Sequence, residues 1–150
     1  MNDVIAALTD LWSAAASGGT LDGVQVHDGP QVNSDPSPEW LFTGYDGAEG
    51  SEYVEGATVE QDLMTFVRGK QETVEVKCAV VVVRGDTDMA AARVRAFEIL
   101  GAAETLLRND MTLGGVVMHA WVALATYVPI QTERGAKVRI WFTVNYQAQF

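Results

Sequence analysis

The stretch TVEVKCAVVVVR, residues 73–84, carries the clearest secondary-structure signal in the chain. Apolar side chains occupy every second position, which is the alternation of a β-strand with one face in a core. These positions are Val74, Val76, Cys78, Val80 and Val82. The other face starts polar and becomes apolar along the strand, in the order Glu75, Lys77, Ala79, Val81 and Val83. We therefore predict a strand that is half solvated at its start and covered on both faces at its end.

Two helices are predicted around this strand. Apolar residues at three-to-four spacing indicate a first helix between a cap at Asn2 or Asp3 and a stop at Ser17-Gly18-Gly19. The second helix covers residues 89–109, after a cap in Asp86-Thr87-Asp88. Its predicted buried stripe is small and apolar, with two larger residues widening it: Ala92, Ala96, Leu100, Ala103 and Leu107, with Phe97 and Leu106.

The rest of the chain adds shorter strands and loops. Short strands are predicted near residues 24–26 and 40–45, and a long hairpin joins residues 116–130 to 137–147. Residues 46–58 are rich in glycine and acids, so we expect a mobile loop there. The whole predicts one α+β domain over residues 1–150, with a mostly antiparallel sheet and both helices on one face. The residues expected to be buried together are Val76, Val80, Val82, Phe97, Leu100, Leu107, Ile140 and Phe142.

Charge is divided unevenly along the chain. Residues 1–67 contain 12 acids and no lysine or arginine, whereas residues 68–150 contain 8 acids and 10 bases, for a net charge of −10. An acidic surface repels phosphate, which argues against gripping nucleic acid. Oppositely charged halves favour head-to-tail packing of subunits, or a channel to which nucleic acid does not stick. A solvated surface is the simpler alternative.

Composition also bears on the cellular context. A single cysteine rules out a disulfide within the chain and suits a reducing cytoplasm. The N-terminus has acids where a signal peptide needs basic residues, so no export signal is expected. The longest apolar runs are far too short to cross a bilayer.

A glycine-containing corner, residues 112–115 (TLGG), joins the second helix to the hairpin. Glycine-rich loops that cradle phosphate precede a helix, because the free N–H groups lie at the helix N-terminus. This corner instead follows its helix, whose carbonyl end repels anions. The glycines are therefore expected to serve a tight turn rather than a phosphate.

Other candidate chemistry is weak. Cys78 with His119 suggests a nucleophile and a base, but no third orienting residue is identifiable, so a buried structural thiol is favoured. His27 and His119 lack a second histidine at metal-ligand spacing. The acids between Glu49 and Asp62 lack the spacing of a calcium loop. No cofactor and no metal are expected.

Trp141 is the more informative residue. Alternation places it on the polar face of its strand, together with Lys137 and Arg139. Tryptophan and arginine are enriched in protein interfaces. An interface and a covering helix both remain open as explanations.

Four segments of the second half resemble one protein family. They are Gly69-Lys70-Gln71-Glu72 before the valine-rich strand, Gly85-Asp86-Thr87-Asp88 after it, the helix through Arg93 and Phe97, and residues 107–115, LRNDMTLGG. This series resembles the tail terminator (tail-completion) proteins of long-tailed bacteriophages. The resemblance covers residues 69–150, matches residues 1–45 only in the order of elements, and does not include the acidic loop. Met111 stands where many relatives have proline.

The resemblance implies a structural virion protein without enzymatic activity or cofactor. Such proteins form a ring, usually of six subunits, that caps the tail tube, ends its polymerisation and joins the head. The implied partners are other copies of the chain, the tail tube protein and a head-completion or connector protein, with DNA passing the lumen and no membrane involved. The implied location is the virion tail near the head, after assembly in the host cytoplasm. Other neck or tail-tube subunits of similar fold are the alternative within this class, and a small enzyme or ligand-binding domain using Cys78 and His119 is the alternative outside it.

Two surfaces are then expected to matter. The subunit interface is predicted to include Arg84, Lys137, Arg139 and Trp141. An acidic segment is predicted to face the lumen or a neighbouring subunit, and its members are Glu49, Glu52, Glu55, Glu60 and Asp62.

Overall fold

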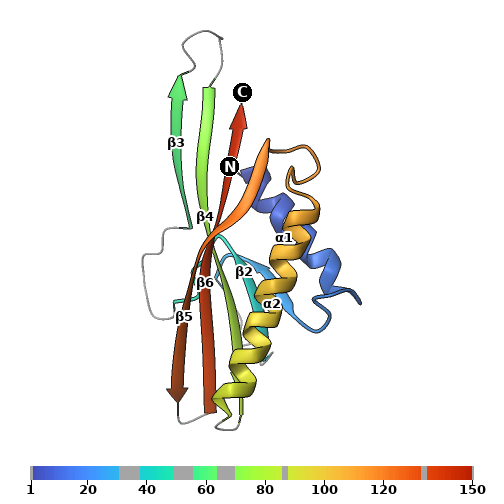
Figure 1. The fold of residues 1–150 in the computed structure, drawn as a ribbon, viewed down its shortest axis with the longest axis vertical. Helices are drawn as coiled ribbons and strands as arrows, with labels where there is room; N and C mark the ends of the chain where they lie inside the picture. The colour runs from blue at the N-terminus through green and yellow to red at the C-terminus, as the bar shows by residue number, and fades with distance from the viewer. Residues whose placement is uncertain are drawn as a thin grey trace.

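The computed structural model of the chain describes residues 2–30, 38–48, 56–63, 70–85, 88–132 and 135–149. Two helices and six strands are found within these residues (Figure 1). In chain order they are α1 (Asn2–Ala16), β1 (Gln25–Asp28), β2 (Glu39–Thr43), β3 (Ala57–Leu63), β4 (Lys70–Arg84), α2 (Met89–Asn109), β5 (His119–Thr132) and β6 (Gly135–Gln149).

All six strands belong to one sheet. β1, β2, β4, β6 and β5 lie side by side in that order, and β3 also pairs with β4. β1 and β2 run parallel, whereas every other pairing is antiparallel. β2 and β3 share one edge of β4, because β3 pairs with its first half and β2 with its second. The predicted α+β fold with a mostly antiparallel sheet is thus confirmed.

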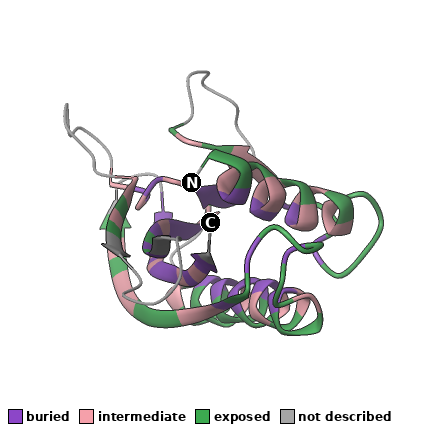
Figure 2. Ribbon diagram, turned by 90° about the horizontal axis from the view of Figure 1, so that it is seen from above, coloured by how far each residue is buried: buried purple, intermediate pink, exposed green. Residues whose placement is uncertain are grey.

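Both helices lie on one face of the sheet, as expected (Figures 1 and 2). This helix face holds the five alternating residues of β4 from Val74 to Val82, all fully buried. On the opposite side, which we call the outer face, Glu75 is exposed, Lys77 is half-buried, and Ala79 and Val81 are buried. β4 is therefore solvated on its outer face at its start and covered on both faces towards its end, as its alternation predicts.

The helices are held to the sheet by apolar stripes. α1 contributes Val4, Leu8 and Trp12 to the core. The Trp12 ring meets the Phe142 ring edge-on, with centroids 6.0 Å apart, and its indole Nε1 donates to the Ala103 carbonyl of α2 at 3.2 Å. This contact ties α1 both to the sheet and to α2, and it satisfies the one polar atom that the buried indole carries.

α2 has the predicted bounds, and the Asp88 carboxylate caps it by accepting from the Ala91 N–H at 3.0 Å. The five residues of its predicted stripe are buried, with Ile99 in addition, and Leu106 is half-buried against the core. Phe97, however, is 47% exposed, so its predicted place in the core is wrong. Each helical residue is rotated about 100° from the one before it. Phe97 directly follows Ala96 of the buried stripe, so its side chain is turned by that angle away from Ala96. The other seven residues predicted to be buried together all lie in one core cluster.

β3 is a strand that the sequence analysis does not predict. A loop is predicted over residues 46–58, but Ala57 and Thr58 begin this strand. Ala57 and Val59 of β3 pack against the core, but three consecutive polar residues, Glu60 to Asp62, follow them, so the alternation is too short to stand out. Residues 49–55 of the predicted loop lie outside the described residues, and the expected mobility stays a prediction.

A bulge divides β5. Val122 is opposite Val144, but Leu124 is opposite Thr143, so Ala123 is an extra residue. Side chains alternate between the two faces of the sheet, so one extra residue reverses the alternation. Residues after the bulge lie on the opposite face from the one that the alternation before the bulge would give them. Val122 packs against the core on the helix face, whereas Leu124, opposite the outer-face residue Thr143, is 50% exposed.

Neither helix in the described part of the chain combines the length and apolar character needed to cross a membrane.

Candidate functional site

The corner after α2 is closed by its own hydrogen bonds. The N–H groups of Leu113 and Val117 donate to the carbonyls of Asp110 and Thr112, and that of Gly114 donates to the Asp110 carboxylate at 3.1 Å. Leu113, Gly114 and Gly115 all have positive φ values, of 49°, 71° and 93°. Glycine tolerates such angles, and the N–H groups are already engaged within the turn. The geometry is that of the expected tight turn, and these N–H groups are not directed at a phosphate.

Cys78 and His119 lie on opposite faces of the sheet. Cys78 is fully buried on the helix face, opposite Phe142. His119 is exposed and lies opposite Gln147, which is in turn opposite Thr73 on the outer face. Burial raises the pKa of the Cys78 thiol to about 12, so the thiol is protonated and inert at neutral pH. The two residues do not form a nucleophile–base pair.

Metal chemistry finds no support in the described part of the chain, where no group of three or more His, Cys, Asp or Glu side chains could hold an ion. Of the predicted acidic segment, Glu60 is exposed in β3 and Asp62 also lies in that strand. Glu49, Glu52 and Glu55 fall outside the described residues.

The outer face carries an aromatic cluster. The Trp40 and Phe42 rings of β2 stack in parallel with centroids 5.5 Å apart, and Tyr45 meets Phe42 edge-on at 5.1 Å. The cluster rests on Ala79 and Val81 of β4. The sequence analysis predicts the strand but not this cluster, although Trp40 and Phe42 occupy alternate positions and so share one face.

Trp141 and Arg139 of β6 extend this surface. Trp141 is half-buried and packs against the aromatic cluster, so neither helix covers it. The Arg139 stem lies against Gly47, where a Cβ added to the glycine would come within 3.2 Å of the Arg139 Cδ. Lys137 is half-buried on the same face of β6. Alternation predicts all three residues on this face, and the structure brings them together there.

Two polar atoms on the outer face of β6 are buried and lack a hydrogen-bond partner among the described residues. They are Nε of Arg139 and Oδ1 of Asn145. A buried donor or acceptor without a partner costs about 1–3 kcal/mol, so such atoms are rare in folded proteins. Both atoms are already shielded from solvent within the chain itself.

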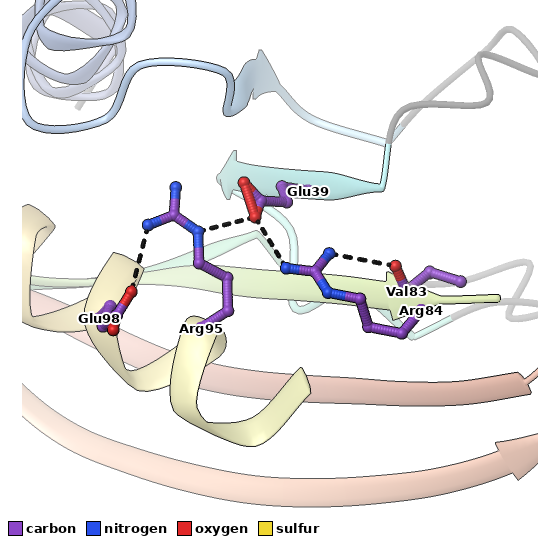
Figure 3. A network of polar contacts seen from close by, with 5 residues as sticks. All are labelled: Glu39, Val83, Arg84, Arg95 and Glu98. Atoms are coloured by element: carbon purple, nitrogen blue, oxygen red, sulfur yellow. Dashed lines mark hydrogen bonds and ion pairs between the residues drawn. The ribbon is translucent and has the colours of Figure 1, made fainter. Parts of the chain in front are cut away.

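Arg84, which the sequence analysis groups with these residues, lies elsewhere. It occupies the helix-face register of β4 and donates through Nη2 to Glu39 Oε2 at 3.4 Å (Figure 3). The same oxygen accepts from Arg95 Nε at 2.7 Å, and Arg95 also reaches Glu98 at 3.4 Å. Burial would raise the pKa of Glu39, but the hydrogen bonds and charges of Arg95 and Arg84 outweigh it and hold that pKa below its ordinary value. Glu39 of β2 therefore links Arg84 of β4 to Arg95 of α2, and Arg84 lies on the opposite face of the sheet from Arg139.

Comparison of the sequence with protein-family models gives no match, and comparison with curated proteins gives none either.

Proposed function

We propose that this chain is a structural ring subunit that caps the tail tube of a long-tailed bacteriophage and provides the surface joining it to the head. The resemblance of residues 69–150 to tail terminator proteins supports this proposal. The segments that carry the resemblance are structural elements here: a buried strand, a capped helix and a tight glycine turn. No cofactor and no reaction enter the proposal.

The observation that carries the proposal is the outer face of the sheet, which neither helix covers and on which the half-buried residues Lys137, Arg139 and Trp141 gather. Trp141 is half-buried and is of a residue type that interfaces favour, whereas the aromatic cluster that it packs against is buried within the chain. A carboxylate from a neighbouring molecule could pair with the half-buried Arg139 side chain and strengthen the contact through its charge.

The charge distribution indicates what such a neighbour offers. Residues 1–67 hold 12 acids and no base, whereas Arg139 and Lys137 lie on β6 in the basic half. One patch meeting a different patch on the next copy is a heterologous contact, which closes into a ring when the rotation allows it. A ring of six, with acidic segments turned to the lumen, would let DNA pass without adhering. The tail tube protein and a head-completion or connector protein would contact its two ends.

The test is the length of assembled tails. Tails made in cells that lack this protein should grow beyond their normal length and fail to join heads, and the purified protein should restore head joining. Tails of normal length that join heads without it would overturn the proposal. Normal tail length with failed head joining would instead assign the chain to another neck position.

A further inference from the structure

One exposed stripe of α2 is apolar. Val94 and Phe97 are 55% and 47% exposed, and exposed Ala90 and Gly101 continue the stripe one turn to either side. Residues spaced by three and four positions share one side of a helix. The Phe97 ring contacts the Tyr127 ring of β5, with centroids 5.9 Å apart, so the surface continues from the helix onto the edge strand. We call Val94, Phe97, Gly101 and Tyr127 the α2 patch.

Gly101 leaves room for close approach. It lies in the middle of α2, where glycine weakens a helix relative to alanine. A Cβ built at this position meets nothing within 4 Å, so no neighbour among the described residues requires the glycine. The backbone of another element can therefore come close to α2 at this point.

Among the described residues, the ion pairs of α2 leave one of its charged side chains unpaired beside the patch. Arg95 pairs with Glu98 and Glu39, and Arg108 pairs with Glu104. Arg93 is exposed and has no ion-pair partner in the described part of the chain. The patch thus presents an apolar stripe next to an available guanidinium, which suits an element that combines small residues with a carboxylate.

The exposed side of α1 has that composition. Asp3, Ala6, Asp10 and Ala14 are exposed and recur at three-to-four spacing. No salt bridge to Asp3 or Asp10 occurs among the described residues. α1 packs over β1 and β2, whereas the α2 patch adjoins β5, and these strands lie at opposite edges of the sheet. Two copies side by side would therefore bring α1 of one towards α2 of the other.

We infer that the α2 patch binds the exposed side of α1 from a second copy of this chain, with Asp10 of that copy paired to Arg93. Ala6 and Ala14 then lie over Phe97 and Gly101. The contact is heterologous, so each copy offers one half to each neighbour. The inference rests on the proposed ring for its second copy, and it adds a helix-to-helix contact to the sheet-face contact at Arg139.

Mixed cysteine cross-linking tests this contact. One protein carries Ala14→Cys and the other carries Gly101→Cys, and the two are mixed at high concentration and low salt and oxidised. A cross-link between the variants is expected, with little from either variant alone. Cys78 stays silent because it is fully buried. Cross-linking of the Gly101→Cys protein with itself at the same rate, or no mixed product, would overturn the inference.

Charge reversal supplies the matched control. Arg93→Glu in the Gly101→Cys protein should slow mixed cross-linking roughly fivefold, and Asp10→Arg in the partner protein should restore it. Arg108→Glu, on the same helix but paired to Glu104, should leave the rate unchanged. An equal effect of both arginine changes would show that general charge, and not this pair, governs the contact.

The outcomes separate the two proposals. Rings seen by electron microscopy without mixed cross-links would reject the α1–α2 contact and leave the ring standing. Mixed cross-links with tails that terminate normally in the absence of the protein would retain the contact and reject the terminator role.

Discussion

At the scale of single residues, neighbouring positions of α2 differ sharply in what they contribute to stability. Leu100 is 8% exposed within the core cluster, and Phe97, three residues earlier, is 47% exposed. Leu100→Ala should lower the free energy of unfolding by about 2–5 kcal/mol, because it leaves a cavity in a packed core. Phe97→Ala should cost clearly less, since that ring already faces solvent. Urea denaturation measures both, and equal losses would show that the helix face is wrongly placed.

Glu39 should make stability depend on pH. Its pKa in the folded chain lies below the ordinary 4.5, so its stabilising effect is present above that value and lost as the pH falls through the folded pKa. Glu39→Gln should therefore destabilise the protein at pH 7, by roughly 1.5–3 kcal/mol, the range for hydrogen bonds to charged groups. The difference in the free energy of unfolding between variant and parent should shrink as the pH is lowered. Denaturation curves from pH 7 to pH 3 measure it.

Glu98→Gln is the matched control, because that side chain is 59% exposed and its ion pair with Arg95 spans 3.4 Å. It should change stability little at any pH. A gap for Glu39→Gln that widens on acidification would contradict the assigned role of the two arginines.

At the scale of elements, alanine substitution of two glycines tests whether the corner after α2 needs its left-handed backbone. One glycine lies in the corner and the other lies within the helix. Gly115 has φ of 93°, which an L-residue rarely adopts, whereas Gly101 lies in a helix with open space around it. Gly115→Ala should cost about 1 kcal/mol or more. Gly101→Ala should stabilise the isolated chain by about 0.5–1 kcal/mol. Thermal unfolding compares them, and a stabilising Gly115→Ala would mean that the turn does not need its left-handed geometry.

Long periodic elements are predictable from local sequence. The alternation in β4 predicts which side chains meet the helices, and the stripe and cap of α2 predict both of its ends. β3 and the β5 bulge are not predictable in this way, because each depends on pairing with a distant strand and not on a local pattern. The prediction for Phe97 is wrong because it weighs hydrophobicity above angular position on the helix.

The surface residues also divide into those whose position a local pattern predicts and those whose position depends on the pairing of distant strands. Alternation along β6 correctly predicts that Arg139 and Trp141 lie on one outward face. Arg84 has the same parity as Val82, so the alternation of its own strand already assigns it to the helix face, apart from Arg139 and Trp141, and its part in a subunit interface stays a prediction. The aromatic cluster under Trp141 depends on β2 lying beside β4, which no local pattern specifies.

At the scale of the whole molecule, substitution of Arg139 on the outer face distinguishes an effect on folding from an effect on assembly. Arg139→Met keeps the apolar stem against Gly47 and removes the buried Nε, which lacks a partner among the described residues. The monomer should therefore keep its stability or gain about 1 kcal/mol, because a desolvated donor is lost without a cavity. Assembly should weaken, since the charge offered to the neighbour is gone. Denaturation of the dilute protein and electron microscopy of the concentrated protein measure the two effects.

Salt provides the control for this prediction. Exposed charges are screened beyond about 8–10 Å at physiological ionic strength, so assembly of the parent chain should decline as salt rises. Assembly of the Arg139→Met variant should respond less, because it has lost one of the screened contacts. If that variant unfolds more easily and assembles as well as the parent at every salt concentration, Arg139 supports the fold of its own subunit. The acidic half of a neighbour would then have to be met by other residues of the basic half.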